Sequence, residues 1–379
     1  MDIRKIAAAA GLALALALPA RAEITIGVSI PLTGPGVSLG IPTRNAFELW
    51  PESLAGEKLK LLILDDGSDP TAGVRNARKF IEEEKVDFFV ASAITPPALA
   101  AAGVASESQV VQISPSPLDL APDKGEWTFR IAQNVPVVAT AAVEHMQKAG
   151  VKTLAFLGYN DPYGETWLKA TAAAAEKAGI RLVAVERFAR PDTSANAQAI
   201  KVVMSKPDAV LIVATGSGAV MPHKAVLDKG YKGPIYHTHG AVSADMLRLG
   251  GKDVEGAYAV SGFIPVAEQL PAAHPSRTLA LRFIEQYEKK FGAGSRNQFA
   301  AHVNDILIVL EKALPLALKQ AKPGTREFRA AFRSALESLG DTTVSQGVIP
   351  YARTVHTGLD HRSVVMLKIQ NGNWTLLPN

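Results

Sequence analysis

The sequence predicts an α/β fold of two similar lobes, each built on a largely parallel sheet, and three observations lead to this prediction. Short apolar strands alternate with helices along the chain, a pattern typical of parallel βαβ units. The alternation restarts near residue 136, so a second unit of similar build follows the first. The chain of 379 residues is also long enough for two or so domains of roughly 100–200 residues each.

The first 22 residues have the composition of a secretory signal peptide. Two basic residues precede an apolar run at 6–18, and an Ala-Arg-Ala cleavage site follows. The apolar run is shorter than the roughly 20 residues of a transmembrane helix, although an N-terminal anchor or a buried first helix is the alternative. No cysteine follows that could carry a lipid anchor. We therefore expect residues 1–22 to be removed and the mature chain to be free in a Gram-negative periplasm.

The first unit is expected to consist of short apolar strands separated by helices. The strands are expected at residues 24–30, 59–64, 87–91 and 110–114. The helices are expected at residues 38–54 and 71–84, the second with one apolar face.

The second unit repeats this pattern and is followed by a different one. Its strands are expected at 153–158, 180–185, 209–214, 234–237 and 257–261, and its helices at 138–148, 165–178, 195–204 and 223–229. Three helices at 279–291, 297–320 and 325–339 then precede a closing β-hairpin of residues 363–369 and 374–377. The late helices must pack on one of the units and the last strands must join a sheet, so we expect the chain to pass between the lobes more than once.

The composition excludes several function classes. Without cysteine the chain can form no disulfide, thiol nucleophile or thiolate metal site. The net charge of +4 is spread along the chain, which argues against nucleic-acid binding. The hydrolase, metalloprotease, nucleotide-binding and dinucleotide-binding motifs are all missing, so we expect no enzyme, no cofactor and no metal site. A periplasmic enzyme remains an alternative, because residues that are distant in sequence can meet in a fold.

Three acidic residues raise one metal-site alternative. Asp65, Asp66 and Asp69 are spaced in a way that suggests a calcium loop. However, Gly67 comes too early for that loop, and no glutamate closes it. We predict instead a turn that ends a strand and starts a helix.

Small polar residues follow several of the predicted strands. They include Ser92 and Thr95, Ser116, Tyr163, Thr215 and His239. Ligands of open α/β sheets bind at the carboxyl ends of the strands, where hydroxyls and free helix-start amides suit a carboxylate. At any single position the alternative is a helix cap. Together the residues predict a binding cleft between two lobes.

Five stretches carry a resemblance to a known family. They are ITIGVSIPLTGP at 24–35, LILDDGSDP at 62–70, ISPSP at 113–117, NDPYGE at 160–165 and NGNW at 371–374. In their order and spacing these stretches resemble the periplasmic branched-chain amino acid binding proteins, which serve ABC importers. The resemblance extends over nearly the whole mature chain.

The resemblance implies two Rossmann-like lobes joined by a hinge of three crossings, as in type I periplasmic binding proteins. The first lobe would hold residues 23–135 and 263–345, and the second 136–262 and 346–379. The protein would be a monomer that clamps a small carboxylate between its lobes and passes it to the permease subunits of an ABC transporter. A sensing module for a separate membrane partner is the alternative use of this fold.

The resemblance also implies particular site residues. Ser92 and Ser116 match positions where hydroxyls hold the ligand carboxylate. Tyr163 matches a tyrosine that lines the cleft from the second lobe. Leu118 stands where a second hydroxyl is usual, and Leu39 stands where an aromatic residue covers the ligand.

Two positions in the second lobe also depart from the family pattern. Thr215 falls near a cleft aromatic residue that is absent in this chain. His239 occupies the place of the acid that pairs with the ligand's α-ammonium, and the next acid, Asp245, falls in a predicted helix. A histidine cannot replace a fixed negative charge. If His239 faces the ligand rather than solvent, we expect an organic acid without an α-amino group, such as an aromatic or phenolic acid. A branched-chain or other amino acid is the alternative.

Overall fold

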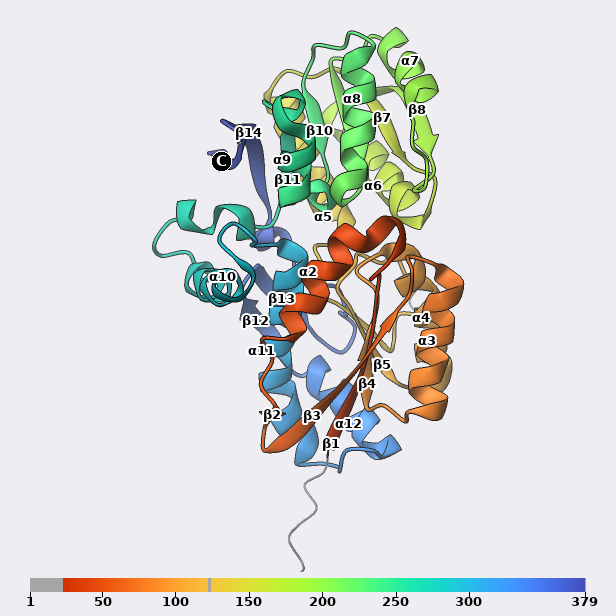
Figure 1. Cartoon of the computed structure of the whole chain (residues 1–379), viewed down its shortest axis with the longest axis vertical. Coiled ribbons are helices and arrows are strands. Elements are labelled where there is room, and N and C mark those ends of the chain that lie inside the picture. The colour runs from red at the N-terminus through yellow and green to blue at the C-terminus, as the bar shows by residue number, and fades with distance from the viewer. Residues whose placement is uncertain (1–22, 122–123, 379) are drawn as a thin grey trace, which may run out of the picture.

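The computed structural model describes residues 23–121 and 124–378 and shows two lobes stacked along the long axis of the molecule (Figure 1). The predicted signal peptide at residues 1–22 lies outside the described residues. Within the described ranges, no helix has the length and apolarity needed to cross a membrane.

The first lobe is built on a six-stranded sheet of order β2-β3-β1-β4-β5-β6, in which only the β2–β3 pair is antiparallel. Its strands are β1 (Glu23–Ile30), β2 (Ser53–Leu54), β3 (Glu57–Asp65), β4 (Phe88–Val90), β5 (Val111–Ser114) and β6 (Thr128–Arg130). Its helices are α2 (Val37–Phe47), α3 (Pro70–Arg78), α4 (Thr95–Ser108), α10 (Arg277–Phe291), α11 (Gln298–Leu318) and α12 (Arg326–Glu337). Side chains alternate between the two covered faces, since Phe88 packs towards α12 while Phe89 packs towards α3 and α4.

The second lobe is built on a seven-stranded sheet of order β15-β14-β11-β10-β9-β7-β8. Its strands are β7 (Thr153–Tyr159), β8 (Arg181–Phe188), β9 (Ala209–Val213), β10 (Ile235–His237), β11 (Tyr258–Ser261), β14 (Val365–Gln370) and β15 (Asn373–Leu376). Its helices are α5 (Val135–Lys148), α6 (Pro162–Ala178), α7 (Asn196–Met204), α8 (Val220–Asp228) and α9 (Ala244–Gly250). The closing hairpin β14–β15 joins the sheet antiparallel to β11, and the other neighbouring strands run parallel.

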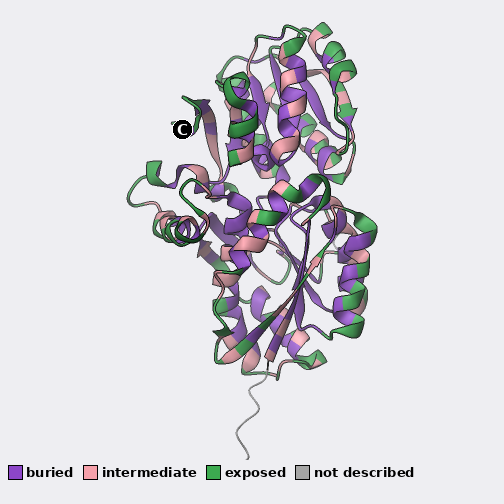
Figure 2. Ribbon diagram, in the orientation of Figure 1, coloured by how far each residue is buried: buried purple, intermediate pink, exposed green. Residues whose placement is uncertain are grey.

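Buried residues gather along the strands and on the inner helix faces of each lobe (Figure 2). One apolar core unites α5 with the strands of the second sheet, and another unites β1 with α10, α11 and α12. Each lobe therefore has a core of its own, which confirms the predicted α/β fold.

Five elements had no counterpart among the sequence-based expectations: α4, β6, the hairpin of β12 (Gly340–Val344) and β13 (Gly347–Tyr351), and β2, which lies in the last residues of the helix expected at 38–54. Helix α4 is rich in alanine on all sides, so it shows little of the periodicity that reveals an amphipathic helix. Strand β6 spans only three residues, too few for an alternating pattern.

The chain passes between the lobes three times. The passages follow β6, β11 and Leu359. The structure differs from the predicted division at the last of them, because the β12–β13 hairpin belongs to the first lobe. Ile349 and Tyr351 are buried in the first core, with the Tyr351 ring centre 5.1 Å from that of Phe129. The boundary predicted at residue 345 therefore comes too early.

Candidate ligand-binding site

A cavity lies between the lobes, at the carboxyl ends of the strands of both sheets. We call it the cleft cavity. Its lining residues in the first lobe are Leu39, Ala93, Ile94, Thr95, Pro115, Pro117, Phe299 and His302, and Ala132 lines it from the first crossing. The second lobe contributes Tyr163, Arg190, Thr215, His239 and Gly240. As the lobes stand, the cavity has room for little more than one water molecule, so a ligand must enter when they separate.

The structure brings five of the predicted site residues together in this cavity: Leu39, Thr95, Tyr163, Thr215 and His239. They come from two lobes and five separate segments of the chain. Because these residues meet, the carboxyl ends of β4, β7, β9 and β10 surround one space.

The other three predicted residues do not line the cleft cavity. The Ser92 hydroxyl accepts a hydrogen bond from the Ile94 N–H at 3.2 Å and also bonds to the buried carboxyl of Asp66. Burial raises the pKa of Asp66 to about 6, and the Ser92 hydroxyl opposes that rise. The hydroxyl of Ser92 is thus bonded inside the first lobe in this arrangement, and its contact with a ligand stays a prediction.

The side chains of Ser116 and Leu118 also contact residues outside the cleft cavity. The Ser116 Oγ lies 3.2 Å from Ser114 Oγ, and both side chains are buried. Leu118 packs in a small apolar cluster under α4. Neither side chain reaches the cleft cavity, although their neighbours Pro115 and Pro117 do.

Arg190 is the main cavity residue that the sequence did not reveal. It follows β8, and its side chain is only 10% exposed. Its Nε donates to Asp161 Oδ2 at 2.5 Å, and its Nη1 donates to Thr215 Oγ1 at 3.0 Å. The guanidinium carbon lies 4.2 Å from the centre of the Tyr159 ring, a cation–π contact. These contacts hold a largely buried guanidinium, paired with Asp161, at the cavity wall.

Asp161 supports Arg190 from the start of α6. Its second carboxylate oxygen accepts from the Gly164 N–H at 3.1 Å and caps the helix. One carboxylate therefore fixes both the start of α6 and the Arg190 guanidinium. The remaining nitrogen, Arg190 Nη2, has no hydrogen-bond partner among the described residues.

Two buried histidines form another part of the wall. Burial lowers the pKa of His239 to about 4, and burial together with the nearby His239 lowers the pKa of His302 to about 3. Both imidazoles are therefore neutral at pH 7, with one donor and one acceptor nitrogen each. Among the described residues, His239 Nδ1 has no hydrogen-bond partner, and the His302 ring has only a weak contact with the Pro115 backbone. His302 lacked a sequence signal because it lies inside the long helix α11, far along the chain from the predicted strand ends.

The remaining wall is neutral or apolar. Leu39, Ala93, Ile94 and Phe299 form one apolar cluster. The Tyr163 hydroxyl is 2.8 Å from Thr238 Oγ1, and burial raises the pKa of this phenol well above its usual value. Arg190 is thus the one charged side chain of the cleft cavity in the described part of the chain, and no acid lines it there.

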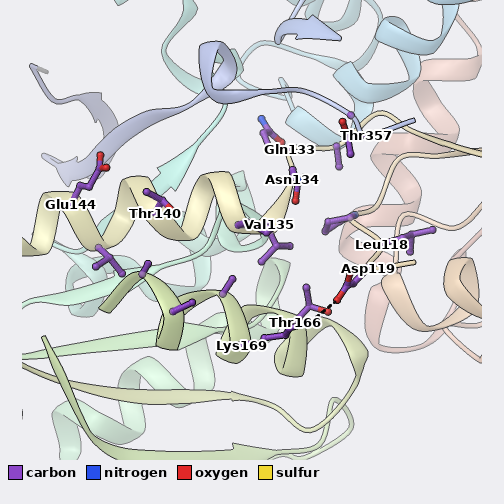
Figure 3. Close-up of a pocket in the computed structure, with 18 of the residues that line it drawn as sticks. Leu118, Asp119, Gln133, Asn134, Val135, Thr140, Glu144, Thr166, Lys169 and Thr357 are labelled. Atoms are coloured by element: carbon purple, nitrogen blue, oxygen red, sulfur yellow. Dashed lines mark ion pairs between the residues drawn. The ribbon is translucent and has the colours of Figure 1, made fainter. Parts of the chain in front are cut away.

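A larger pocket of about 540 Å³ lies beside the cleft cavity (Figure 3). It shares Pro117 and Ala132 with the cavity, and helices α5 and α6 form much of its wall. Leu118 and the ion pair between Asp119 and Lys169, 3.7 Å apart, border it. This pocket also contains an arginine, Arg130, whose Nε and Nη1 donate to the carbonyl oxygens of His356 and Leu118, each at 3.0 Å, and burial lowers its pKa. We take the smaller cleft cavity as the candidate site, because it lies at the carboxyl ends of strands from both sheets and contains five of the predicted residues.

No cluster of three or more metal-ligating side chains occurs in residues 23–121 and 124–378.

Comparisons with known proteins agree with this geometry. A family profile described as "Periplasmic binding protein" matches residues 23–372. The "Leu/Ile/Val-binding protein homolog 3" of Brucella melitensis is 26% identical over 249 residues, which cover 62% of this chain and 67% of that protein. An extracellular ligand-binding receptor from Rhodopseudomonas palustris HaA2 is 42% identical with a TM-score of 0.92, covering 94% of this chain and all of that one.

One solved structure of the same fold contains an aromatic acid. It is an ABC transporter solute-binding protein from Rhodopseudomonas palustris BisB5, in complex with 3,4-dihydroxybenzoic acid. It is 20% identical with a TM-score of 0.78 and covers 93% of this chain and 95% of its own. At this identity the likeness extends to the fold alone.

Proposed function

The chain belongs to the periplasmic binding protein family, whose members bind small molecules for ABC-type transport, and on this premise we propose which ligand it carries. The ligand is a small organic carboxylate without an α-amino group, with an aromatic or phenolic acid favoured. The two lobes close on the ligand, and the closed protein delivers it to the permease subunits of an importer, from a periplasmic location.

The charge of the cleft cavity carries this proposal. Arg190 supplies a buried cation that suits a carboxylate, because charge-assisted bonds to a desolvated guanidinium are strong and directional. A ligand α-ammonium would need an acid in the same space, since a buried unpaired charge is costly. His239, the residue in the acid's place, is neutral at pH 7 because burial lowers its pKa to about 4.

The shape and polarity of the remaining wall favour an aromatic acid. The apolar cluster of Leu39, Ile94 and Phe299 provides a surface for a ring. The imidazoles of His239 and His302 suit a ring hydroxyl, which can donate to one ring and accept from the other. The Rhodopseudomonas complex supports the proposal to the extent that its fold accommodates a phenolic acid.

An amino acid is the second candidate. The curated relative from Brucella is named a Leu/Ile/Val-binding protein homologue. This candidate requires a partner for the ligand's ammonium group. Asp161 contacts the cavity through Arg190, but it is already paired with that residue.

A ligand panel tests the proposal. The mature chain is mixed with benzoate, 4-hydroxybenzoate, 3,4-dihydroxybenzoate, leucine or valine, and unfolding temperatures are measured. A ligand that binds only the folded protein stabilises it by about 2.7 kcal/mol at 100 times its Kd. We expect one or more of the aromatic acids to raise the unfolding temperature and the amino acids to leave it unchanged. Stabilisation by leucine or valine, without any by the aromatic acids, would refute the proposal.

A pair of arginine variants tests the role of the buried cation. Arg190→Gln should weaken binding of the acid found in the panel about 10- to 150-fold, since a hydrogen bond to a charged group contributes about 1.5–3 kcal/mol. Arg187→Gln is the matched control. Arg187 lies on β8 and pairs with Glu165 of α6, but it is 41% exposed and does not line the cavity. Equal effects of the two variants on calorimetrically measured affinity would assign Arg190 a structural role only.

A further inference from the structure

Gln298, the first residue of α11, lies where the two lobes meet. Its side chain is almost fully buried, with 1% of the residue exposed. Helix α11 itself belongs to the first lobe, because residues such as Val303 and Ile306 pack in the core of that lobe. The amide group of Gln298 nevertheless reaches across to the second lobe.

The Gln298 amide donates to two main-chain carbonyls of the second lobe. Its Nε2 bonds to the carbonyl oxygen of His239 and, at 3.1 Å, to that of Val242. These carbonyls belong to the turn of residues 239–242 that follows β10, and Ala241 and Val242 are part of the second core. The Oε1 of Gln298 accepts from the Ser261 hydroxyl at 3.4 Å, at the end of β11 where the chain returns to the first lobe.

We propose that Gln298 is a positioning residue that holds this turn against the first lobe and so couples occupation of the cleft cavity to lobe closure. The turn presents the His239 side chain to the cavity while Gln298 binds the carbonyl of the same residue. Phe299, the next residue after Gln298, lines the cavity from the first lobe. A ligand that contacts His239 and Phe299 therefore steadies both partners of the cross-lobe bond, and the bond in turn favours ligand binding.

Gln298 is itself held in place by the first-lobe segment that precedes β13. Its carbonyl oxygen accepts from Gln346 Nε2 at 3.1 Å. The same Gln346 nitrogen lies 3.4 Å from Asp305 Oδ2, and Asp305 Oδ1 accepts from the Ser345 N–H at 2.8 Å. The donor that crosses the lobe interface is thus held by a buried polar network of the first lobe. Such a network restricts the rotamer of Gln298 to the one that reaches the second lobe.

Distances between the lobes test the inference in the ligand-free protein. The natural sequence contains no cysteine, so spin labels can be attached to Glu107→Cys in the first lobe and Met204→Cys in the second. Both positions are well exposed, at 70% and 75%. Pulsed electron paramagnetic resonance then gives the populations of short and long distances between the labels.

Two replacements of Gln298 should reduce the closed population to different degrees. Gln298→Met keeps the length of the side chain but loses the donors, and it should lower the ratio of closed to open protein about tenfold. Gln298→Glu should lower it further, because a carboxylate would face two carbonyl oxygens. Gln112→Met is the matched control: Gln112 is fully buried and donates to the Ala98 carbonyl at 2.9 Å, entirely within the first lobe. It should reduce the unfolding temperature without changing the distances.

Three results would overturn the inference. They are unchanged distances in both Gln298 variants, an equal change in Gln112→Met, and a ligand-free parent protein with no closed population. The inference rests on the proposed function only in that closure captures the ligand. Because the distance measurement uses no ligand, a failed ligand panel and a failed closure test are separate outcomes.

Discussion

Replacing Gly216 by alanine should prevent the lobes from closing fully. Gly216 follows β9 in the second lobe and faces α2 of the first. A Cβ atom built at Gly216 would lie 2.2 Å from Ser38 Oγ and 2.8 Å from Leu39 Cδ1. Ser38 and Leu39 belong to the other lobe, so the overlap arises only when the lobes are together.

The structure allows the size of the effect to be estimated. Overpacking of a tight contact costs about 1–3 kcal/mol, which corresponds to a roughly 5- to 150-fold loss of affinity for a ligand that requires closure. A second cost arises because Gly216 has a φ of +51°, a conformation that costs an alanine about 1 kcal/mol. This backbone cost is present in the open and closed protein alike, so it lowers the unfolding temperature but cancels in the binding constant.

Gly179→Ala separates the two costs. Gly179 ends α6 with a φ of +69°, and a Cβ built there meets no atom within 4 Å. Calorimetric titration with an acid identified in the ligand panel should show parent-like affinity for Gly179→Ala and weakened affinity for Gly216→Ala. The two variants should lose similar amounts of unfolding free energy. Parent-like affinity in Gly216→Ala would show that the contact with Ser38 is not part of the ligand-bound arrangement.

Two further predictions concern aspartates. Asp161→Asn keeps an oxygen that can cap α6 but removes the counter-ion of Arg190, so the ligand-free protein should lose about 3 kcal/mol of stability. An anionic ligand replaces the missing charge and should therefore raise the unfolding temperature more in this variant than in the parent; an equal or smaller rise would contradict the idea. Burial raises the pKa of Asp305 from 3.8 to about 7, so the folded protein binds the carboxyl proton more tightly than the unfolded chain does. The stability that this proton contributes is therefore lost as the pH rises through 7. Urea unfolding at pH 6 and pH 8.5 should show this loss in the parent and a smaller one in Asp305→Asn, whereas an identical loss in both would place the titrating group elsewhere.

The sequence predicted the elements whose side chains alternate or repeat clearly, and it missed those without such a pattern. Strand β9 is apolar throughout because helices cover both faces of its sheet, and it was expected within one residue of its bounds. Helix α4 begins with Thr95, Pro96 and Pro97 and continues with alanines, so its residues mark a helix start but no buried face. The β12–β13 hairpin is defined by its contacts with distant helices, and these contacts also explain why the last crossing falls after Leu359 rather than at 345.

Residues that follow predicted strands do lie in the region of the candidate site. Their position in the sequence does not tell whether each side chain points into the cleft cavity. Thr95 and Ser92 both follow β4, yet only Thr95 lines the cleft cavity. Ser92 turns inward because the buried Asp66 provides a hydrogen-bond partner. That partner comes from the end of β3, and its proximity depends on the order of strands in the sheet, which the sequence does not state.

Arg190 shows most clearly why the site could not be completed from the sequence. Its partner Asp161 lies 29 residues earlier, and its contact with Thr215 spans 25 residues in the other direction. An arginine in a loop is usually exposed, so it becomes a binding element only when folding buries it beside an acid and a ring. The two indications of the ligand's charge are therefore independent. The absence of an acid at His239 was visible in the sequence and argues against a ligand cation, whereas the buried cation at Arg190 appears only in the fold and favours a ligand anion. An α-amino acid offers a carboxylate to Arg190, but its ammonium group finds no acid near His239. A simple carboxylate pairs with Arg190 and brings no cation that needs a partner.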